Sequence, residues 1–346
     1  MNIKVDLDKK FELPAFARWL LAILGALVTG GVLLALVGAN PVTAYVDMVQ
    51  GTFGSLFDLS LVLTEMVPLV IIGLGLLIAF RARIWNIGAE GQFMFGALLG
   101  GAFALHVPLA TPFLAVPAVL VVGACAGALW GLLVALARVR WQVNEVISSL
   151  LLNYVALFVF AYAVRKPLRD PGGFKPTSER IPDQFELADF PVDEIRVHIG
   201  IILALLLVPL VGFLVNRSPF GLRATMFGMN PEAAQAAGVN TSRMTVKIML
   251  LSGAFAGLAG IVQVLGSEFR LSNNIATGYG FTAIVVALIS RLRPVGVVIA
   301  AALLGALTLG GDVIQRTQQV PRVLTMVIQA IFVLFLLLAD RRREEK

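Results

Sequence analysis

This sequence has few charged residues for its length. Asp, Glu, Lys and Arg together make up 14% of its 346 residues, whereas 58% of the residues are hydrophobic. About a quarter of the residues of a soluble globular domain are charged, so the composition excludes a soluble domain and indicates a chain whose main solvent is lipid. In lipid, only helices or closed barrels satisfy the backbone polar groups. The apolar runs have helical lengths, so we expect an all-α, polytopic transmembrane helical bundle.

Cysteine and histidine are also scarce. The single cysteine, Cys125, excludes a disulfide within the chain, and the two histidines, His106 and His198, fall near predicted membrane edges. The sequence places no His/Asp pair, Cys/His pair or metal-ligand cluster on adjacent spans, which argues against an intramembrane enzyme. No lysine directly follows a glycine, so the phosphate-binding pattern GxxxxGK(S/T) does not occur. We therefore expect no catalytic residue, no metal and no cofactor in this chain.

Long apolar runs are what the sequence does have, and we expect about 8–10 of them to cross the membrane. The eighth run is short for a crossing of about 20 residues, so we expect it to be half-inserted or tilted. Together the runs define one transmembrane domain over residues 15–340, with tails at 1–14 and 341–346. The runs cover residues 15–38, 59–80, 84–107, 109–137, 143–164, 198–216, 246–266, 278–291, 294–312 and 320–339.

The distribution of arginine predicts the orientation. Lys and Arg concentrate in cytoplasmic loops, so both termini are predicted to be cytoplasmic, and the net charge of +6 reflects topology and not a nucleic-acid partner. The connection at 39–58 and a polar loop at about 165–197 then face the exterior, while a second polar loop at about 217–245 lies in the cytoplasm. The basic connections contain Arg81 and Arg83, Arg138 and Arg140, Arg291 and Arg293, and Arg341 to Arg343.

Small residues recur four positions apart in several spans. This spacing lets helix backbones approach closely in a membrane, so it predicts a tightly packed bundle and no particular chemistry. The residues are Gly96 and Gly100, Gly123, Gly127 and Gly131, and Gly253 and Gly257.

The cytoplasmic loop contains the signature of a short helix. Asn230 is a favourable N-cap, Pro231 suits the first helical position, and Glu232 suits the positive end of the helix dipole. Alanines follow, and Gly238 supplies a C-terminal stop. A helix of about two turns is unstable alone, so we expect it to lie on a partner's surface. The alternative is a well-capped loop helix without a partner.

This loop resembles the EAA loop of bacterial ABC import permeases, which docks into the ATP-binding subunit. The resemblance rests on Glu232-Ala233-Ala234, Gly238, Ile248 and Leu250, with Leu251 where many members have proline. It implies that this loop couples the chain to an ATPase. The residues to which it gives that role are Gly221, Arg223, Asn230, Pro231, Glu232, Ala233, Ala234 and Gly238.

Longer blocks are similar to the simple-sugar and nucleoside permeases of the same wider group, which also serves ribose and branched-chain amino acids. They are VNEVISSLLLNYVALFV (143–159), FGMNPEAAQAAGVN (227–240) and GYGFTAIVVALISRLRPVGVVIAAALLGAL (278–307). NIGAEGQ (86–92) and EVISSLLLNY point to the nucleoside branch. Ser290-Arg291 departs from the family, which usually has glycines there.

The resemblance implies a multi-pass permease subunit of the bacterial inner membrane. ATP would be bound by a separate ATP-binding subunit. The other partners would be a second permease, either a sister chain or a second copy, and an extracytoplasmic substrate-binding lipoprotein.

Polar residues inside the spans are the candidates for the solute path. A carboxylate in a span costs about 2.5–3.5 kcal/mol on insertion scales and usually faces a cavity or a partner. Gly88 and Gly91 loosen the helix beside Glu90, which suggests an interrupted helix. Asn153 beside Tyr154 suits a nucleobase, because an amide there adjoins an aromatic face. The path candidates are Asn86, Glu90, Gln92, Asn153, Tyr154 and Gln263.

Structural bracing is the alternative for Asn86, Glu90 and Asn153. The remaining intramembrane polar residues are Glu65, Glu145 and Glu268. Glu145 is expected to meet Arg138, Arg140 or the coupling region, and Glu268 to meet either the binding protein or Arg270.

The function predicted on these grounds is ATP-driven import of nucleosides. A related alternative has the same role with ribose-like sugars or another small polar solute as cargo. An alternative from another class is an ion-coupled secondary transporter with Glu65 or Glu90 as its coupling site, but that leaves the coupling helix without a purpose.

Overall fold

The computed structural model describes residues 15–109, 111–192, 194–275 and 278–340. Over these residues the chain is helical, and the extended pairings are limited to two isolated bridges, Thr177 with Ser272 and Asp189 with His198. The predicted all-α class is therefore confirmed.

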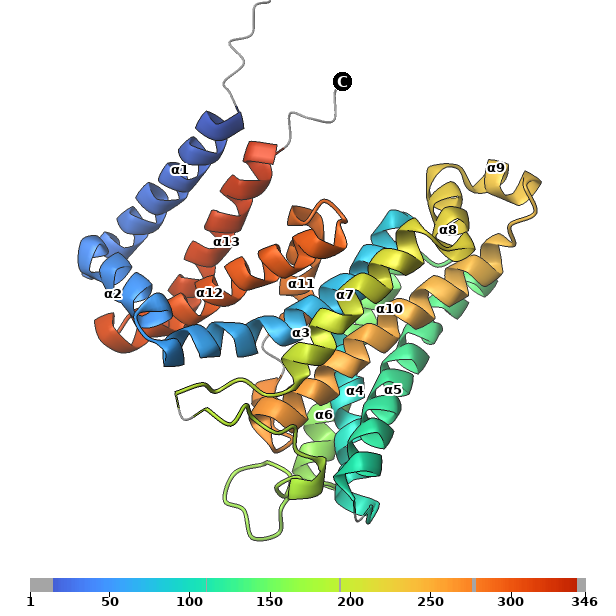
Figure 1. The fold of residues 1–346 in the computed structure, drawn as a ribbon, viewed down its shortest axis with the longest axis horizontal. Helices are drawn as coiled ribbons and strands as arrows, with labels where there is room; N and C mark the ends of the chain where they lie inside the picture. The colour runs from blue at the N-terminus through green and yellow to red at the C-terminus, as the bar shows by residue number, and fades with distance from the viewer. Residues whose placement is uncertain (1–14, 110, 193, 276–277, 341–346) are drawn as a thin grey trace, which may run out of the picture. The chain divides into compact units, whose positions relative to one another are not determined.

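The contacts group the chain into two compact units, one from the residues up to Gly51 with those from Gly310 onward, the other from Thr52–Leu309. In the smaller unit, α1 (Ala15–Leu36) lies beside α13 (Arg322–Asp340) (Figure 1). Its core joins residues from both ends of the chain, and the Gln318 amide donates to Asp47 at 2.7 Å. The core residues are Leu34, Ala44, Ile314 and Val320.

Helix α2 (Pro41–Phe53) was not expected, because the 39–58 segment was recognised only as an external connection. The local signals for it are present. The Asn40 side chain accepts from the N–H of Val42 at 2.9 Å, and Pro41 stands at the first helical position. A search for long apolar runs overlooks such a short and partly polar helix.

The larger unit is built around α10, which packs along α5, α4 and α3 (Figure 1). A single π-helical turn extends α10 at its end, and α11 is short. The helices of this unit are α3 (Leu56–Arg81), α4 (Ala89–His106), α5 (Pro112–Trp141), α6 (Glu145–Arg165), α7 (Gly200–Asn216), α8 (Pro219–Met229), α9 (Pro231–Ala236), α10 (Thr241–Gln263) with its π turn η2 (Val264–Glu268), α11 (Tyr279–Ile289) and most of α12 (Pro294–Gln318). Two 3₁₀ turns, η1 (Asp183–Phe185) and η3 (Asn273–Ile275), complete it.

The two ends of the larger unit carry different connections. Helices α8 and α9 lie at one end. The chain between α6 and α7 lies at the opposite end, beside the C-terminal end of α10 (Figure 1). That loop is folded onto the chain after α10, because the N–H groups of Ser178 and Ile181 donate to the carbonyls of Leu271 and Phe269, both at 2.9 Å. The coupling candidates and the predicted external loop are thus well separated.

Glycine allows the central helices to approach backbone to backbone. A Cβ on Gly257 of α10 would lie 2.3 Å from the Gly123 carbonyl oxygen and 2.7 Å from the Gly127 Cα of α5. A Cβ on Gly96 of α4 would lie 2.3 Å from the Cα of Gly257. Helices α4, α5 and α10 therefore meet at Gly257, and the small-residue spacing in the sequence predicted this packing.

Among the described residues, the spans agree with the sequence except at three of the ten runs, those at 84–107, 198–216 and 278–291. Seven helices among the described residues are long and apolar enough to cross a membrane, or eight if α7 and α8, which are bent by 64°, form one span. Helix α11 is short, as expected. Helix α4 begins at Ala89 and not at residue 84, because the chain turns first, with Arg83 at φ 51° and the N–H of Gly88 bonded to the Asn86 side chain at 3.1 Å.

Gly257→Ala should lower the free energy of unfolding by about 1–3 kcal/mol, because the added methyl group meets backbone atoms that cannot rotate away. Gly212→Ala in α7 is the matched control, since the nearest atom to its Cβ is a Pro294 side-chain atom 3.9 Å away. The control should be neutral or stabilising, as alanine favours helix over glycine. Thermal unfolding of both variants in nanodiscs measures the difference. Equal effects would show that the helices can separate at Gly257.

Candidate functional site

A pocket of about 300 Å³ lies where α4, α6 and the start of α11 meet. This volume is at the lower end of the range for small-molecule sites. Two of the lining side chains are hydrogen-bonding groups placed deep in the protein, and most of the others are apolar or aromatic. The lining residues are Glu90 and Met94 of α4, Asn153, Tyr154 and Leu157 of α6, and Gly278 and Phe281 at α11.

Glu90 is held by the first backbone amides of α11. Its side chain is 4% exposed, and its two carboxylate oxygens accept from the N–H groups of Gly278 at 3.1 Å and Gly280 at 2.6 Å. Glu90 also stands in the first turn of its own helix, so its charge faces the positive ends of two helices. Gly280 has to be glycine here, because a Cβ would lie 2.3 Å from the Glu90 nitrogen.

Asn153 fixes α6 to the start of α4. Its carbonyl oxygen accepts from the N–H of Gly91 and its amide donates to the carbonyl of Ile87, both at 2.9 Å. The side chain is 5% exposed and cannot rotate without losing both bonds. The neighbouring Tyr154, by contrast, is 57% exposed. The structure therefore combines a fixed amide and a more accessible ring in one wall of the pocket.

The first residue of α11 is anchored from three directions. The Tyr279 hydroxyl donates to Glu65 of α3 at 2.8 Å, the Gln263 amide of α10 donates to that hydroxyl at 3.5 Å, and the Phe93 ring of α4 lies 5.6 Å from the tyrosine ring between centroids. Glu65, predicted as an intramembrane polar residue, and Gln263, predicted for the solute path, thus both contact Tyr279, and neither lines the pocket. A role of Gln263 in the solute path stays a prediction.

Gly278, Tyr279, Gly280 and Phe281 were missing from the predicted site. They form the sequence GYGF at the start of the 278–307 block, which supported the family resemblance but was not assigned to the site. Its pattern of two glycines around an aromatic residue is a signal for close backbone approach, and it could have identified this turn.

Asn86 and Gln92 form a buried network away from the pocket lining. The Asn86 amide donates to Gln92 and to Ser252 of α10, both at 2.9 Å, and the Gln92 amide donates back to Asn86 at 3.1 Å. Both side chains are fully buried. This arrangement ties the turn before α4 to α10, and a role of these residues in the solute path stays a prediction.

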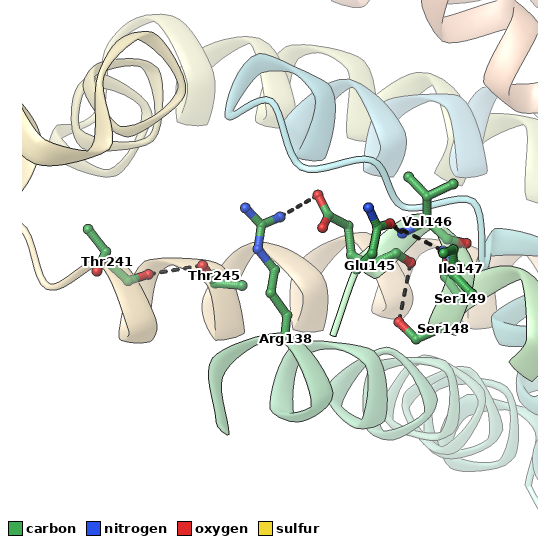
Figure 2. A network of polar contacts seen from close by, with 9 residues as sticks. Arg138, Glu145, Val146, Ile147, Ser148, Ser149, Thr241 and Thr245 are labelled. Carbon is green, nitrogen blue, oxygen red and sulfur yellow. Dashed lines mark hydrogen bonds and ion pairs between the residues drawn. The ribbon is translucent and has the colours of Figure 1, made fainter. Parts of the chain in front are cut away.

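Glu145, expected near an arginine, pairs with Arg138. The carboxylate of Glu145 at the start of α6 lies 2.5 Å from the guanidinium of Arg138 at the end of α5 (Figure 2). Figure 2 also draws Thr241 and Thr245 of the first turns of α10. At the opposite end of the unit, Glu268 is half-buried in the π turn, and Arg270 pairs with Asp170 at 3.2 Å.

The predicted coupling helix is present as α9, with the predicted ends. The Asn230 side chain accepts from the N–H groups of Glu232 and Ala233, both at 3.0 Å, Pro231 is the first helical residue, and Gly238 has φ +84°. Glu232 and Ala233 are exposed, as are Arg223 on α8 and Asn230, Pro231 and Gly238 around α9, whereas Gly221 and Ala234 are buried.

Comparison with known proteins identifies the chain. Residues 59–337 match the model of the branched-chain amino acid transport system permease component. The chain belongs to this family. A glucose ABC transporter permease of Haloferax volcanii is 36% identical over 98% of this chain and 92% of its own length. A guanosine ABC transporter permease of Bacillus subtilis is 33% identical over 91% of each chain, and a nucleoside ABC transporter permease of Lactococcus lactis is 27% identical over 90% and 88%. No solved structure has a significant match.

As a member of this permease family, the protein is a multi-pass membrane permease subunit of an ABC importer. Membership favours the ATP-driven importer over the ion-coupled alternative. The GYGF block that forms the start of α11 lies within the matched range.

Asn86→Ala should lower the free energy of unfolding by about 1–3 kcal/mol and leave the KM of solute uptake unchanged, because it leaves buried groups on Gln92 and Ser252 without a partner. Combining it with Ser252→Ala should cost less than the sum of the two single changes. Thermal unfolding and uptake by the assembled importer measure both quantities. A raised KM with unchanged stability would instead place Asn86 on the solute path.

Proposed function

We propose that this subunit forms the pathway for nucleosides in an ATP-driven importer and is coupled to the ATPase through α8 and α9. The observation that carries the coupling proposal is the exposure of α9. This helix is too short to be stable by itself, yet both its ends are capped and most of its residues face away from the rest of the unit. A surface of small side chains around Glu232 suits a groove in a partner.

Helix α8 can pass a movement of α9 on to the other helices of the larger unit. Gly228 of α8 lies directly against the end of α3, since a Cβ there would be 2.6 Å from the Arg81 carbonyl oxygen. The Arg81 guanidinium in turn donates to Asn216 at 2.8 Å and to the carbonyl of Leu292 at 3.1 Å. Leu292 is in the turn after α11, so α8, α7 and α11 share one anchor.

The partners follow from the type of transporter. We propose that ATP is bound and hydrolysed by a separate ATP-binding subunit, and that this chain binds no cofactor. A second permease, which is a sister chain or a second copy, and an extracytoplasmic substrate-binding lipoprotein would complete the importer.

Nucleosides are the proposed cargo because two of the relatives named above are guanosine and nucleoside permeases. The NIGAEGQ and EVISSLLLNY blocks, which pointed to the nucleoside branch, supply Glu90, Asn153 and Tyr154 to the pocket. A second candidate is a simple sugar, which the similarity to a glucose permease favours.

The test is uptake of radiolabelled uridine and glucose by proteoliposomes containing the complete importer. ATP inside the vesicles should drive uridine uptake, and Glu232→Lys should reduce it at least about tenfold, because the reversed charge opposes both the helix dipole and docking. Glu232→Gln, which keeps the shape of the side chain, is the control and should retain most of the activity.

Two outcomes would contradict the proposal. Uptake of glucose without uridine would change the cargo. Uptake driven by an imposed proton or sodium gradient, without ATP and indifferent to Glu232→Lys, would overturn the coupling role of α9.

A further inference from the structure

We propose that the pocket at the start of α11 is the recognition site for a neutral nucleoside, in which the Glu90 carboxylate accepts a ribose hydroxyl and Tyr154 and Phe281 contact the base. This inference deepens the proposed function, on which it rests, by assigning the recognition of the cargo to particular atoms.

The hydrogen-bonding capacity of Glu90 is not fully used. A carboxylate has about four acceptor positions, and the backbone N–H groups of Gly278, Gly280 and Phe281 occupy three of them. About one acceptor position therefore remains, and it belongs to a residue that lines the pocket. A hydroxyl of the ribose ring can donate to this remaining position.

Asn153 adds a donor beside this acceptor. Its amide uses one N–H for the carbonyl of Ile87, and one N–H remains. Because the two bonds of Asn153 hold the side chain in place, the free N–H has a fixed direction before any solute arrives. Such a group favours solutes that offer an acceptor, such as a ring oxygen or a base carbonyl.

The remaining lining suits a flat apolar surface. Tyr154 and Leu157 of α6, Met94 of α4 and Phe281 of α11 surround the polar groups. Tyr154 and Phe281 are 57% and 43% exposed, so their rings are accessible and not packed into the core. Aromatic side chains bind any nucleobase by its face, whereas a simple sugar would leave much of this apolar surface uncovered.

The negative charge of Glu90 disfavours phosphorylated solutes. The N-terminus of an interrupted helix commonly binds an anionic group of the solute, but here Glu90 already occupies the first amides of α11. A phosphate would meet a buried carboxylate where it would need a donor. The site is therefore expected to accept nucleosides and to reject nucleotides.

Protection of a cysteine in the pocket tests the assignment directly. Leu157→Cys in a Cys125→Ser background, in the complete importer in nanodiscs, places a single reactive thiol of this chain in the pocket wall. Uridine should slow its modification by a small methanethiosulfonate reagent at least about fivefold. The 2′,3′-dideoxy analogue should protect much less, and uridine 5′-monophosphate should not protect. The matched control is Phe158→Cys, which adjoins Leu157 on α6 but does not line the pocket, and its rate should not change.

A second variant keeps the test independent of folding. Tyr154→Leu alters an exposed ring and should abolish protection by uridine while thermal stability is retained. Equal protection by the nucleoside and the nucleotide, equal protection at residues 157 and 158, or no protection in an importer that takes up uridine with ATP would overturn the inference. Absence of ATP-driven uridine uptake by the unmodified importer would instead contradict the proposed function.

Discussion

A carboxylate inside the membrane domain needs compensation, and the contact between Glu90 and the first amides of α11 provides it. Placing such a charge in a span costs about 2.5–3.5 kcal/mol, and a hydrogen bond to a charged group returns about 1.5–3 kcal/mol. Two such bonds, with the positive ends of α4 and α11, therefore offset the cost. The same contact decides where α11 begins, which glycines it needs and where a pocket remains.

The surrounding packing makes this contact possible. Helices α4, α5 and α10 meet through glycines at backbone distance, and the Asn86, Gln92 and Ser252 network holds the turn before α4 against α10. Asn153 then joins α6 to that same turn, so the polar wall of the pocket is rigid before a solute binds. The other end of α11 leads to the Leu292 turn, where Arg81 connects it to α7 and, through the end of α3, to α8. In this way α11 connects the pocket beside Glu90 to the end of the larger unit that carries α8 and α9.

Local patterns in the sequence predicted much of this structure. The apolar runs predicted most of the helices, and the glycine spacing predicted the packing of α5 on α10. Asn230, Pro231 and Gly238 predicted the ends of α9. These features could be predicted because each depends on residues within one or two helical turns of one another. The sequence did not reveal which polar residues meet. Glu90 reaches Gly278 across 188 positions, and Asn86 and Glu90, which a continuous helix would place on one face, are separated by the turn that ends at Gly88. The departure at Ser290-Arg291 has a backbone consequence, since Arg291 and Leu292 both adopt positive φ, at 52° and 54°.

The most direct measurement is an electron cryomicroscopy structure of the complete importer in nanodiscs with uridine, trapped before release of the solute. We expect density for the ribose within hydrogen-bonding distance of the Glu90 carboxylate, with the base against Tyr154 or Phe281, and with Glu90 still bonded to the amides of α11. Uridine bound elsewhere along the pathway, with this pocket filled by lipid or by side chains, would contradict the central claim that the start of α11 and Glu90 together form the solute site.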